Sequence, residues 1–317
     1  LQTNYKNLNT AKIVSQNIFG IDINRSIARI AKMKLLLEAN GKTNILCTNS
    51  LEDLDSIKLL LGQKNGFDLI LTNPPFGAKI TQSSILSKFD LGHKWSSHEN
   101  KFFKTRTVYA NQNAEILFIE RCLQLLKEGG RMAIVLPNGN FENPSLDYLR
   151  YYIKQKAKVI AIVNLPQETF IPYGTGVKTS ILFLEKDSKN EEKQYPIFFG
   201  RVTKLGYQGN KNGTPLYKKD KYGQTIKDKN GQPIIDENFT TIIEDYKVFQ
   251  EGKKVENKNS FSIQFNELNG RFDFDFYSPE NRKMFSHLNH TKAVRLGDIC
   301  EIVKVKSRKL KDPNLLV

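Results

Sequence analysis

The chain has 317 residues, of which 39% are hydrophobic and 26% are charged, and this balance fits a globular protein of one large or two ordinary domains. No apolar run approaches the ~18 residues of a membrane helix and no signal peptide is evident, so we expect no membrane partner. The formal net charge of +15 indicates a polyanionic partner such as nucleic acid, although a lysine-rich proteome explains the charge equally well. The three cysteines and four histidines form no metal-binding or disulfide pattern, so we expect reduced thiols in a cytoplasm and no metal site.

The first part of the chain alternates short apolar runs with amphipathic stretches, which indicates strands that alternate with helices. The unbroken apolar character of residues 67–72 predicts a strand buried on both faces. In the helix predicted over residues 24–39, Ile27 and Ile30 belong to the apolar, inward face. The other elements predicted here are strands over residues 17–22 and 44–48 and a helix over residues 53–61 that Gly62 ends.

Residues 78–112 show no clear period, but regular elements are predicted again after them. A helix over residues 113–128, capped by Gly129-Gly130, precedes a strand over residues 131–137. The loop before the last strand has about a dozen residues, too few for a crossover helix, so that strand should run antiparallel. These elements predict a doubly wound α/β sheet closed by one antiparallel strand. Its last elements are a helix over residues 146–155 and strands over residues 159–165 and 177–185.

Beyond about residue 187 the sequence becomes rich in Lys, Asn, Gly and Gln, and we find no internal repeat. A helix over residues 240–251 and a strand over residues 261–265 are predicted. We therefore divide the chain into a sheet domain at residues 1–187, an extension of hairpins and helices at residues 188–290, and the start of another domain at residues 291–317. Short β-hairpins are predicted at four turn signals, Gly209-Asn210, Asn212-Gly213, Tyr222-Gly223 and Asn230-Gly231.

The strongest chemical signal is Asn73-Pro74-Pro75-Phe76, directly after the predicted strand 67–72. Ligands of open α/β sheets bind at the carboxyl ends of the strands. The Asn73 side-chain oxygen and the Pro74 carbonyl can each accept a hydrogen bond from an aromatic amine, which favours a pyramidal amine with a free lone pair. Proline has no N–H and a fixed φ, so these acceptors are held in place before a substrate arrives, and Phe76 can stack on a base. The alternative is a rigid Pro-Pro turn.

With this motif, residues 18–186 resemble the methylation subunits of type I restriction–modification systems, a class of N-6 adenine DNA methyltransferases. The resemblance rests on Gly20-Ile21-Asp22 and on residues 68–77, 129–137 and 174–186. It implies a Rossmann-like class I methyltransferase sheet with a mixed α+β C-terminal extension. It also implies methyl transfer from S-adenosylmethionine to the exocyclic amine of adenine in double-stranded DNA, with specificity and restriction subunits as partners.

The resemblance also implies cofactor-binding residues. Asp22, followed by Ile23, matches the acid that holds the ribose hydroxyls, although a helix N-terminal cap explains Asp22 as well. Asn49-Ser50-Leu51 matches the segment that meets the cofactor's adenine, where the family usually has Asp in place of Asn49. A simple loop is the alternative there.

The chain departs from the family at its beginning. The family's first strand and glycine-rich cofactor motif belong before Leu1, and Leu1 is not an initiator methionine. We therefore expect a piece of a longer protein that binds S-adenosylmethionine weakly and is inactive alone. Near the other end, residues 294–305 resemble the opening of a DNA target-recognition domain in specificity subunits, with a domain-closing strand pair as the alternative.

Methylating a duplex base requires extruding it from the stack, which calls for a basic surface with aromatic residues beside the pocket. Residues 78–110 interleave such side chains, and the alternative is a solvated loop with a few buried aromatics. Two other functions remain as alternatives. The first is an amine methyltransferase that uses the same motif on RNA or protein glutamine, and the second is a non-catalytic DNA-binding or assembly module. The predicted nucleic-acid contacts are Lys79, Lys94, Trp95, Lys101, Lys104 and Arg106.

Overall fold

A computed structural model of the chain describes residues 10–39, 43–62, 65–99, 101–189, 194–291, 293–294 and 296–300. The chain forms two compact units, Leu1–Phe274 and Asp275–Val317. The smaller unit contains the helices α10 (Pro279–His290) and α11 (Leu296–Ile299). Only a few residues of the predicted recognition-domain opening are described, because residues 301–317 lie outside the described residues.

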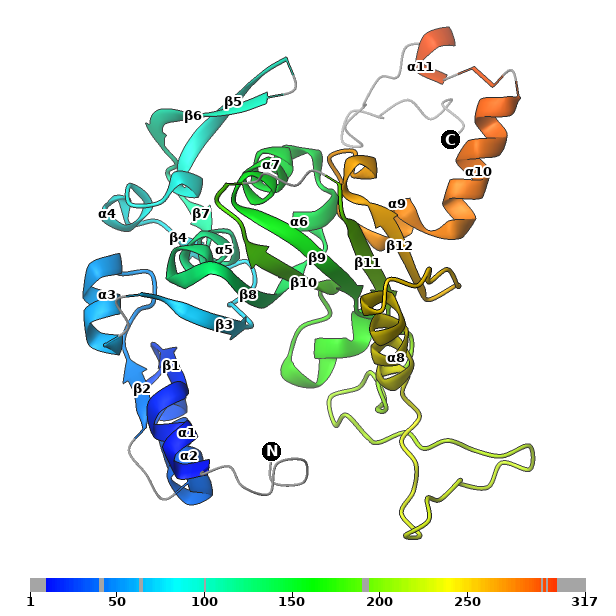
Figure 1. The fold of residues 1–317 in the computed structure, drawn as a ribbon, viewed down its shortest axis with the longest axis horizontal. Helices are drawn as coiled ribbons and strands as arrows, with labels where there is room; N and C mark the ends of the chain where they lie inside the picture. The colour runs from blue at the N-terminus through cyan, green and yellow to red at the C-terminus, as the bar shows by residue number, and fades with distance from the viewer. Residues whose placement is uncertain are drawn as a thin grey trace, which may run out of the picture. The chain divides into compact units, whose positions relative to one another are not determined.

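A six-stranded sheet forms the centre of the larger unit, in the order β12-β11-β9-β10-β8-β3 (Figure 1). Strands β3, β8, β9 and β11 run parallel, whereas β10 is antiparallel to both of its neighbours, β8 and β9. This arrangement confirms the predicted α/β sheet and the antiparallel strand that the short loop required. The strands are β3 (Phe67–Thr72), β8 (Leu126–Pro137), β9 (Ala157–Asn164), β10 (Thr179–Lys186), β11 (Pro196–Arg201) and β12 (Ser260–Gln264).

Helices α5 (Ala114–Leu125) and α7 (Asp147–Lys156) connect the parallel strands and bury their apolar sides against the sheet. The predicted inward residues Ile116, Leu117 and Ile119 of α5 are buried. Helix α8 (Phe239–Gln250) packs on β11 and places Ile242 in a core cluster of that strand. Burial of these side chains gives the sheet a continuous core on which the loops at its carboxyl edge are supported.

The N-terminal part of the larger unit is a small parallel pair, β1 (Phe19–Asp22) and β2 (Asn44–Cys47), which pair with no other strand in the described residues. The neighbouring helices are α1 (Thr10–Asn17), α2 (Arg25–Ala39) and α3 (Leu54–Leu61), and Gly62 ends α3 in the left-handed conformation, as predicted. The predicted inward face of α2 is wrong, because Ile27 and Ile30 are exposed. Ala28 is buried instead, since its side of α2 is the one that faces β1 and β2.

Strand β3 is the edge of the six-stranded sheet. Its Leu69 and Leu71 are 59% and 71% exposed, so the prediction of burial on both faces is wrong. Ile70 packs into a cluster with Ile57 of α3, whereas no described element covers the face that carries the two leucines. An apolar run therefore predicted the strand correctly but not its place at an edge.

The Gly129-Gly130 pair does not cap a helix, contrary to the prediction. Helix α5 ends at Leu125, and β8 begins at the next residue. A Cβ on Gly130 would lie 2.8 Å from the Phe67 carbonyl oxygen, and the pairing of β8 with β3 shifts register here. Gly130 allows this close backbone approach within the sheet, whereas Gly129 adopts a positive φ of 72°.

The sheet continues past the boundary placed at residue 187, because β11 and β12 belong to it. Between β11 and α8 lies the predicted hairpin-rich segment, whose bridges include Tyr207 with Pro215 and Lys219 with Thr225. Among the described residues, no helix combines the length and apolar character needed to cross a bilayer.

Candidate active site

The Asn-Pro-Pro-Phe motif directly follows β3, at the carboxyl end of that strand. Pro74 is buried and Phe76 is half-buried, whereas Asn73 is exposed. Within the described residues the Asn73 side chain has no hydrogen-bond partner. The motif therefore combines a fixed backbone with a side-chain amide that is open to a ligand.

Glu115, in the first turn of α5, fixes the end of the motif. Its side chain is buried, and its carboxylate accepts the Gly77 N–H at 3.1 Å and the Asn113 side-chain amide at 3.0 Å. Gly77 has a φ of 68°, which turns the chain toward β4 (Lys79–Ile80). Strand β4 pairs with β7 (Gln112–Asn113), so the start of α5 supports the motif from one side.

An aromatic pair supports the motif from another side. The Phe76 ring meets the Phe170 ring edge to face, with centroids 5.6 Å apart. Phe170 lies in the 3-10 helix η3 (Gln167–Tyr173), which joins β9 to β10 where the sequence predicted only a Pro/Gly-rich loop. Tyr173 of the same helix contacts Phe170 and is 80% exposed. Helix η3 thus adds aromatic surface next to the motif.

Asp22 ends β1, and its Oδ1 accepts the Asn24 N–H at 2.7 Å. The alternative role of Asp22 as a helix cap is wrong, because the side-chain oxygen of Asn24 accepts the first free N–H groups of α2, those of Ser26 and Ile27. The second carboxylate oxygen of Asp22 has no hydrogen bond within the described residues. That oxygen is available to a ligand at the carboxyl end of β1.

The predicted segment 49–51 lies beside Asp22, because β1 and β2 pair in register up to Asp22 and Cys47. Asn49 accepts the Leu51 N–H at 3.0 Å and thereby closes a turn, and the Leu51 side chain is buried. The structure therefore brings Asp22 and segment 49–51 to one edge, with Ile23 exposed next to them.

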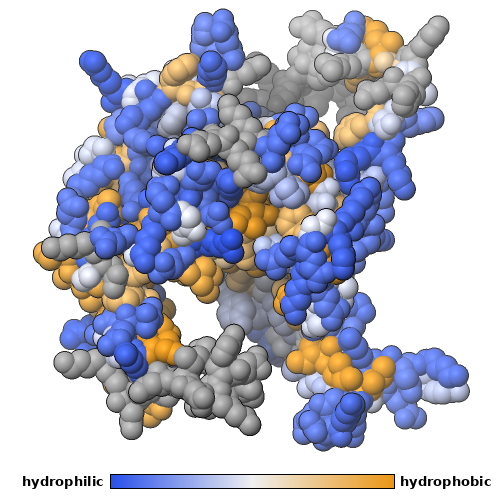
Figure 2. Space-filling view, in the orientation of Figure 1, coloured by the Kyte–Doolittle hydropathy of each residue, from blue (hydrophilic) through white to orange (hydrophobic). Residues whose placement is uncertain are grey.

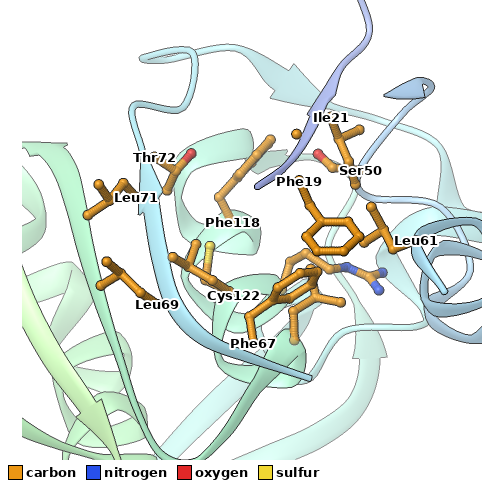
Figure 3. A pocket seen from close by; sticks show the side chains of 14 residues that line it. Phe19, Ile21, Ser50, Leu61, Phe67, Leu69, Leu71, Thr72, Phe118 and Cys122 are labelled. Atoms are coloured by element: carbon orange, nitrogen blue, oxygen red, sulfur yellow. The ribbon is translucent and has the colours of Figure 1, made fainter. Parts of the chain in front are cut away.

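A cavity of about 180 Å³ lies between β1 and β3 (Figure 3). Phe19 and Ile21 line it from β1, and Phe118 and Cys122 line it from α5. Thr72 also lines it and directly precedes Asn73, so the cavity extends to the beginning of the motif. Of the predicted cofactor residues, which are all described, Ser50 alone lies on its wall.

Arg121 of α5 also borders this cavity and is 2% exposed. One guanidinium nitrogen donates to the Glu52 carbonyl at 2.6 Å, whereas Nε and Nη1 have no partner in the described residues. The group lies over the Phe89 ring, and burial lowers its pKa. A buried cation with free donors adds polarity to an otherwise apolar wall.

The predicted nucleic-acid residues fall on or beside one antiparallel hairpin, β5 (His93–His98) with β6 (Lys101–Val108). The hairpin belongs to the insertion between β4 and β7, so its base lies close to the motif along the chain. The positively charged side chains are exposed, and Lys104 pairs with Asp90 at 2.5 Å. The exposed residues are Lys79 on β4 and Lys94, Lys101, Lys104 and Arg106 on the hairpin.

Trp95 is half-buried and anchors this hairpin within the protein. Its indole N–H donates to the Asp90 carbonyl at 3.2 Å, and its ring stacks on Tyr148 of α7 with centroids 6.1 Å apart. Phe103, another of the aromatic residues interleaved with the basic ones, is 51% exposed. Phe103 is therefore more accessible to a base than Trp95.

Glu120 of α5 holds the base of the hairpin. Its buried carboxylate accepts the N–H groups of Asp90 at 2.9 Å and Leu91 at 2.8 Å. Burial raises the pKa of Glu120 to about 7. Sequence reasoning missed Glu115, Glu120 and Phe170. The sequence carried a signal for Glu115 alone, an acidic residue in the first turn of a predicted helix, and a favourable interaction with the helix dipole explains that position as well.

Solved structures share this fold. The modification subunit of a putative type I restriction enzyme from Vibrio vulnificus YJ016 superposes with a TM-score of 0.57 at 20% identity, covering 90% of this chain and 53% of that one. The type I methyltransferase subunit from Streptococcus thermophilus gives 0.54 at 17% identity, covering 82% and 48%. The chain thus shares the α/β fold of these modification and methyltransferase subunits.

The family model described as N-6 DNA methylase matches residues 1–277, and the chain belongs to this family. The type I restriction enzyme EcoEI methylase subunit of Escherichia coli is 27% identical over 183 residues, which are 57% of this chain and 33% of that protein. The type II restriction enzyme and methyltransferase RM.Eco57I of Escherichia coli is 25% identical over 212 residues, 59% of this chain and 20% of that protein. The chain spans a third or less of the length of these two relatives.

The family implies S-adenosylmethionine as the methyl donor. The residues that would hold its nucleoside half are Asp22, whose free oxygen can accept from a ribose hydroxyl, and Asn49, whose Oδ1 accepts the Leu51 N–H and whose NH₂ group lies 3.5 Å from a Glu52 carboxylate oxygen. The cavity beside them, about 180 Å³, is smaller than the roughly 300 Å³ at the lower end of small-molecule sites, and its lining combines apolar side chains with the polar Ser50, Thr72 and Arg121. The described residues therefore offer candidate contacts for the nucleoside half of the donor, and we identify none among them for its methionine half. In this part of the chain no cluster of acidic, His or Cys side chains could hold a metal ion.

Proposed function

We propose that the protein containing this chain transfers a methyl group from S-adenosylmethionine to the exocyclic amine of adenine in double-stranded DNA. The observation that carries the proposal is the Asn73 amide, which is exposed and without a partner among the described residues at the carboxyl end of β3. Glu115 and Phe170 support the motif around it. A side-chain amide held in this way suits a ligand that offers hydrogen-bond donors.

In the proposed reaction, the Asn73 Oδ1 and the Pro74 carbonyl accept the two hydrogens of the adenine amine. These hydrogen bonds favour a pyramidal nitrogen, so its lone pair is free to attack, and the bound donor supplies an electrophilic methyl group. Phe76 stacks on the extruded base, and the amine loses its extra proton after the transfer. The motif is fixed before the base arrives, which lowers the cost of reorganisation in the transition state.

The basic hairpin is proposed to contact DNA phosphates beside the extruded base. Lys94, Lys101 and Arg106 are exposed on it, and Lys79 is exposed next to the motif. Charged side chains at these positions suit the backbone, since phosphate contacts position a protein without reading sequence. Lys104 has a weaker claim because Asp90 already pairs with it, and Trp95 would act by holding the hairpin in place.

Specificity and restriction subunits are proposed as partners, and a bacterial cytoplasm as the location. The support is the printed description of one relative as the methylase subunit of a type I restriction enzyme. Another relative is described as a restriction enzyme and methyltransferase in one, so the two activities also occur together.

The test is adenine-methylation mapping of DNA from cells that carry the full-length gene, compared with Asn73→Ala and Asn73→Asp variants. We expect methylated adenines at one defined site, lost in Asn73→Ala and partly kept in Asn73→Asp, because aspartate still offers an acceptor oxygen at the same place. Unmethylated DNA from cells with well-expressed protein would contradict the proposal. Methyl groups found instead on RNA or on protein glutamine would identify a different substrate.

A further inference from the structure

The segment between β11 and α8 contains a short repeat that the sequence reading missed. The same pattern, Asn or Asp, then Lys, any residue and Gly, occurs three times within residues 205–237. Each copy ends in a glycine with positive φ: 56° at Gly213, 81° at Gly223 and 77° at Gly231. These glycines confirm the predicted hairpin turns. We call this segment, residues 205–237, the three-turn arm; it is the yellow-green segment of Figure 1.

The first residue of each copy closes its turn in the same way. The Asp220 Oδ1 accepts the N–H groups of Tyr222 and Gln224, both at 2.9 Å. Asp228 repeats this with the N–H groups two and four residues later, at 2.8 and 2.9 Å. Asn210 accepts the N–H groups two and three residues later, at 3.1 and 2.9 Å. Each polar side chain thus folds back on its own turn, and the lysine after it is exposed.

Backbone hydrogen bonds join the turns into one unit. Lys218 donates to the Ile234 carbonyl at 2.8 Å, Ile226 to the Lys218 carbonyl at 2.8 Å, and Ile234 to the Ile226 carbonyl at 2.9 Å. These three bonds form a closed ring. The arm has little apolar core, since Tyr217 and Ile235 are 39% and 49% exposed. The shape of the arm therefore comes from its hydrogen-bonded turns, which leave most of its side chains exposed to a binding partner.

The surface that the arm presents is positively charged. The three-turn arm, residues 205–237, contains six lysines and four acidic residues. Asp220 and Asp228 accept hydrogen bonds inside their turns, and Asp236, at the base of the arm, pairs with Lys204. None of the lysines at the turn tips, Lys211, Lys221 and Lys229, forms an ion pair within the described residues. Figure 2 shows hydrophilic surface at the end of the arm and apolar surface nearer its base.

The base of the arm is fixed to the helix that touches the motif. The Tyr207 hydroxyl donates to the Thr169 carbonyl of η3 at 2.7 Å. A Cβ on Gly209 would lie 2.5 Å from Glu168, so the arm and η3 approach closely there. Phe170, which follows Thr169 in η3, contacts Phe76 of the motif. The arm therefore starts beside the candidate active site.

We propose that the three-turn arm binds the sugar–phosphate backbone of the DNA duplex next to the target base, with Lys211, Lys221 and Lys229 contacting phosphates. The proposal rests on the function proposed above, because it takes DNA as the substrate. Repeated cations at equivalent turn tips, which form no ion pair in the described residues although Lys221 lies over the Tyr222 ring, match the repeated charges of a phosphate backbone. A protein partner would favour apolar anchors at the contact, and apart from Tyr222 the turn tips have none.

The test measures the binding of a 30-base-pair duplex to the full-length protein, with any partner subunits it requires, over a range of salt concentrations. In one variant Lys211, Lys221 and Lys229 are replaced by Gln. In the matched control, three exposed lysines that form no ion pair in the described residues, Lys156, Lys247 and Lys258, are replaced by Gln. We expect the arm variant to reduce the slope of log K against log salt by about 3, and the control to leave the slope unchanged.

A second variant changes the charge in the opposite direction. Asp220→Asn with Asp228→Asn should keep both turns, because Asn210 already closes the first one, and should strengthen binding by removing two negative charges. Unchanged binding in both arm variants, or an equal loss in the control, would overturn the proposal. Loss of a partner subunit with unchanged DNA affinity would overturn it as well. Asn73→Ala separates the two proposals, since it should abolish methylation and leave DNA binding intact.

Discussion

Glu115 offers the sharpest test of how the motif is held. Replacing it by alanine removes the buried carboxylate that accepts the N–H of exposed Gly77 and the side-chain amide of half-buried Asn113, and leaves both donors without this partner. Hydrogen bonds to a charged group contribute roughly 1.5–3 kcal/mol each, so Glu115→Ala should remove about 3–6 kcal/mol of local stabilisation. If about half of that holds the motif in its reactive geometry, the methylation rate falls by a factor between about 10 and 160.

Glu115→Gln is the matched control, because Asn113 can adapt to it. The Asn113 Oδ1 is buried without a partner, so a rotation of its amide would bring that oxygen toward the NH₂ group of the new glutamine side chain. The Gly77 N–H would keep an acceptor. Only the charge is lost, so we expect a cost of about 1 kcal/mol and a rate within about fivefold of wild type.

The assay is a single-turnover methylation rate on a DNA duplex, with DNA affinity and urea unfolding measured on the same preparations of full-length protein. The expected result is a slow Glu115→Ala enzyme that still binds DNA within about threefold of wild type. A folded Glu115→Ala protein with a wild-type rate would refute the reasoning, and so would a Glu115→Gln protein as slow as Glu115→Ala.

Three other predictions follow from single contacts. Burial raises the pKa of Glu120 from 4.5 to about 7, so between these pH values the folded state keeps a proton that the unfolded chain releases. The free energy of unfolding should therefore fall by up to about 3 kcal/mol as the pH rises from 4.5 to 7. Urea titrations at pH 5 and 8 measure this fall, and Glu120→Gln should remove it. Phe170→Leu removes an edge-to-face contact with Phe76 worth about 0.5–1.5 kcal/mol, so the methylation rate should fall by up to about tenfold, and no change would show that the aromatic support is dispensable. Asp22→Ala should weaken S-adenosylmethionine binding to the full-length protein with little loss of stability, whereas Asn24→Ala should cost about 1 kcal/mol of stability and leave that binding unchanged. Calorimetry measures the binding and thermal unfolding the stability. Equal effects of the two variants would contradict the roles assigned to the two residues.

Local signals predicted the order and type of most elements. The predicted strand 67–72 is β3 to the residue, and the turn signals became real turns at Gly213, Gly223 and Gly231. The short loop before β10 correctly required an antiparallel strand. These features depend on side-chain periodicity and backbone conformation, which a single stretch of sequence contains.

The errors concern neighbours that a stretch of sequence does not specify. Leu69, Leu71 and Ile27 were placed in a core by their apolar character, yet exposure depends on which element covers a face. Glu115 was missed because its partner Gly77 lies 38 residues away along the chain. The DNA contact of Trp95 stays a prediction, but its indole N–H and ring are both engaged within the protein, which the surrounding lysines did not indicate.

The two basic elements and the two supports of the motif form one system. The hairpin β5–β6 is inserted between β4 and β7, and β7 directly precedes α5, where Glu115 accepts the Gly77 N–H. The three-turn arm is bound to η3, where Phe170 touches Phe76. Each element proposed to bind DNA phosphates is therefore attached to a structure that also positions the motif. A base can react only when its DNA backbone is held in register with the pocket for the amine. Because both phosphate-binding elements are attached to the supports of the motif, they would hold the DNA backbone and the extruded base in a fixed position relative to the motif.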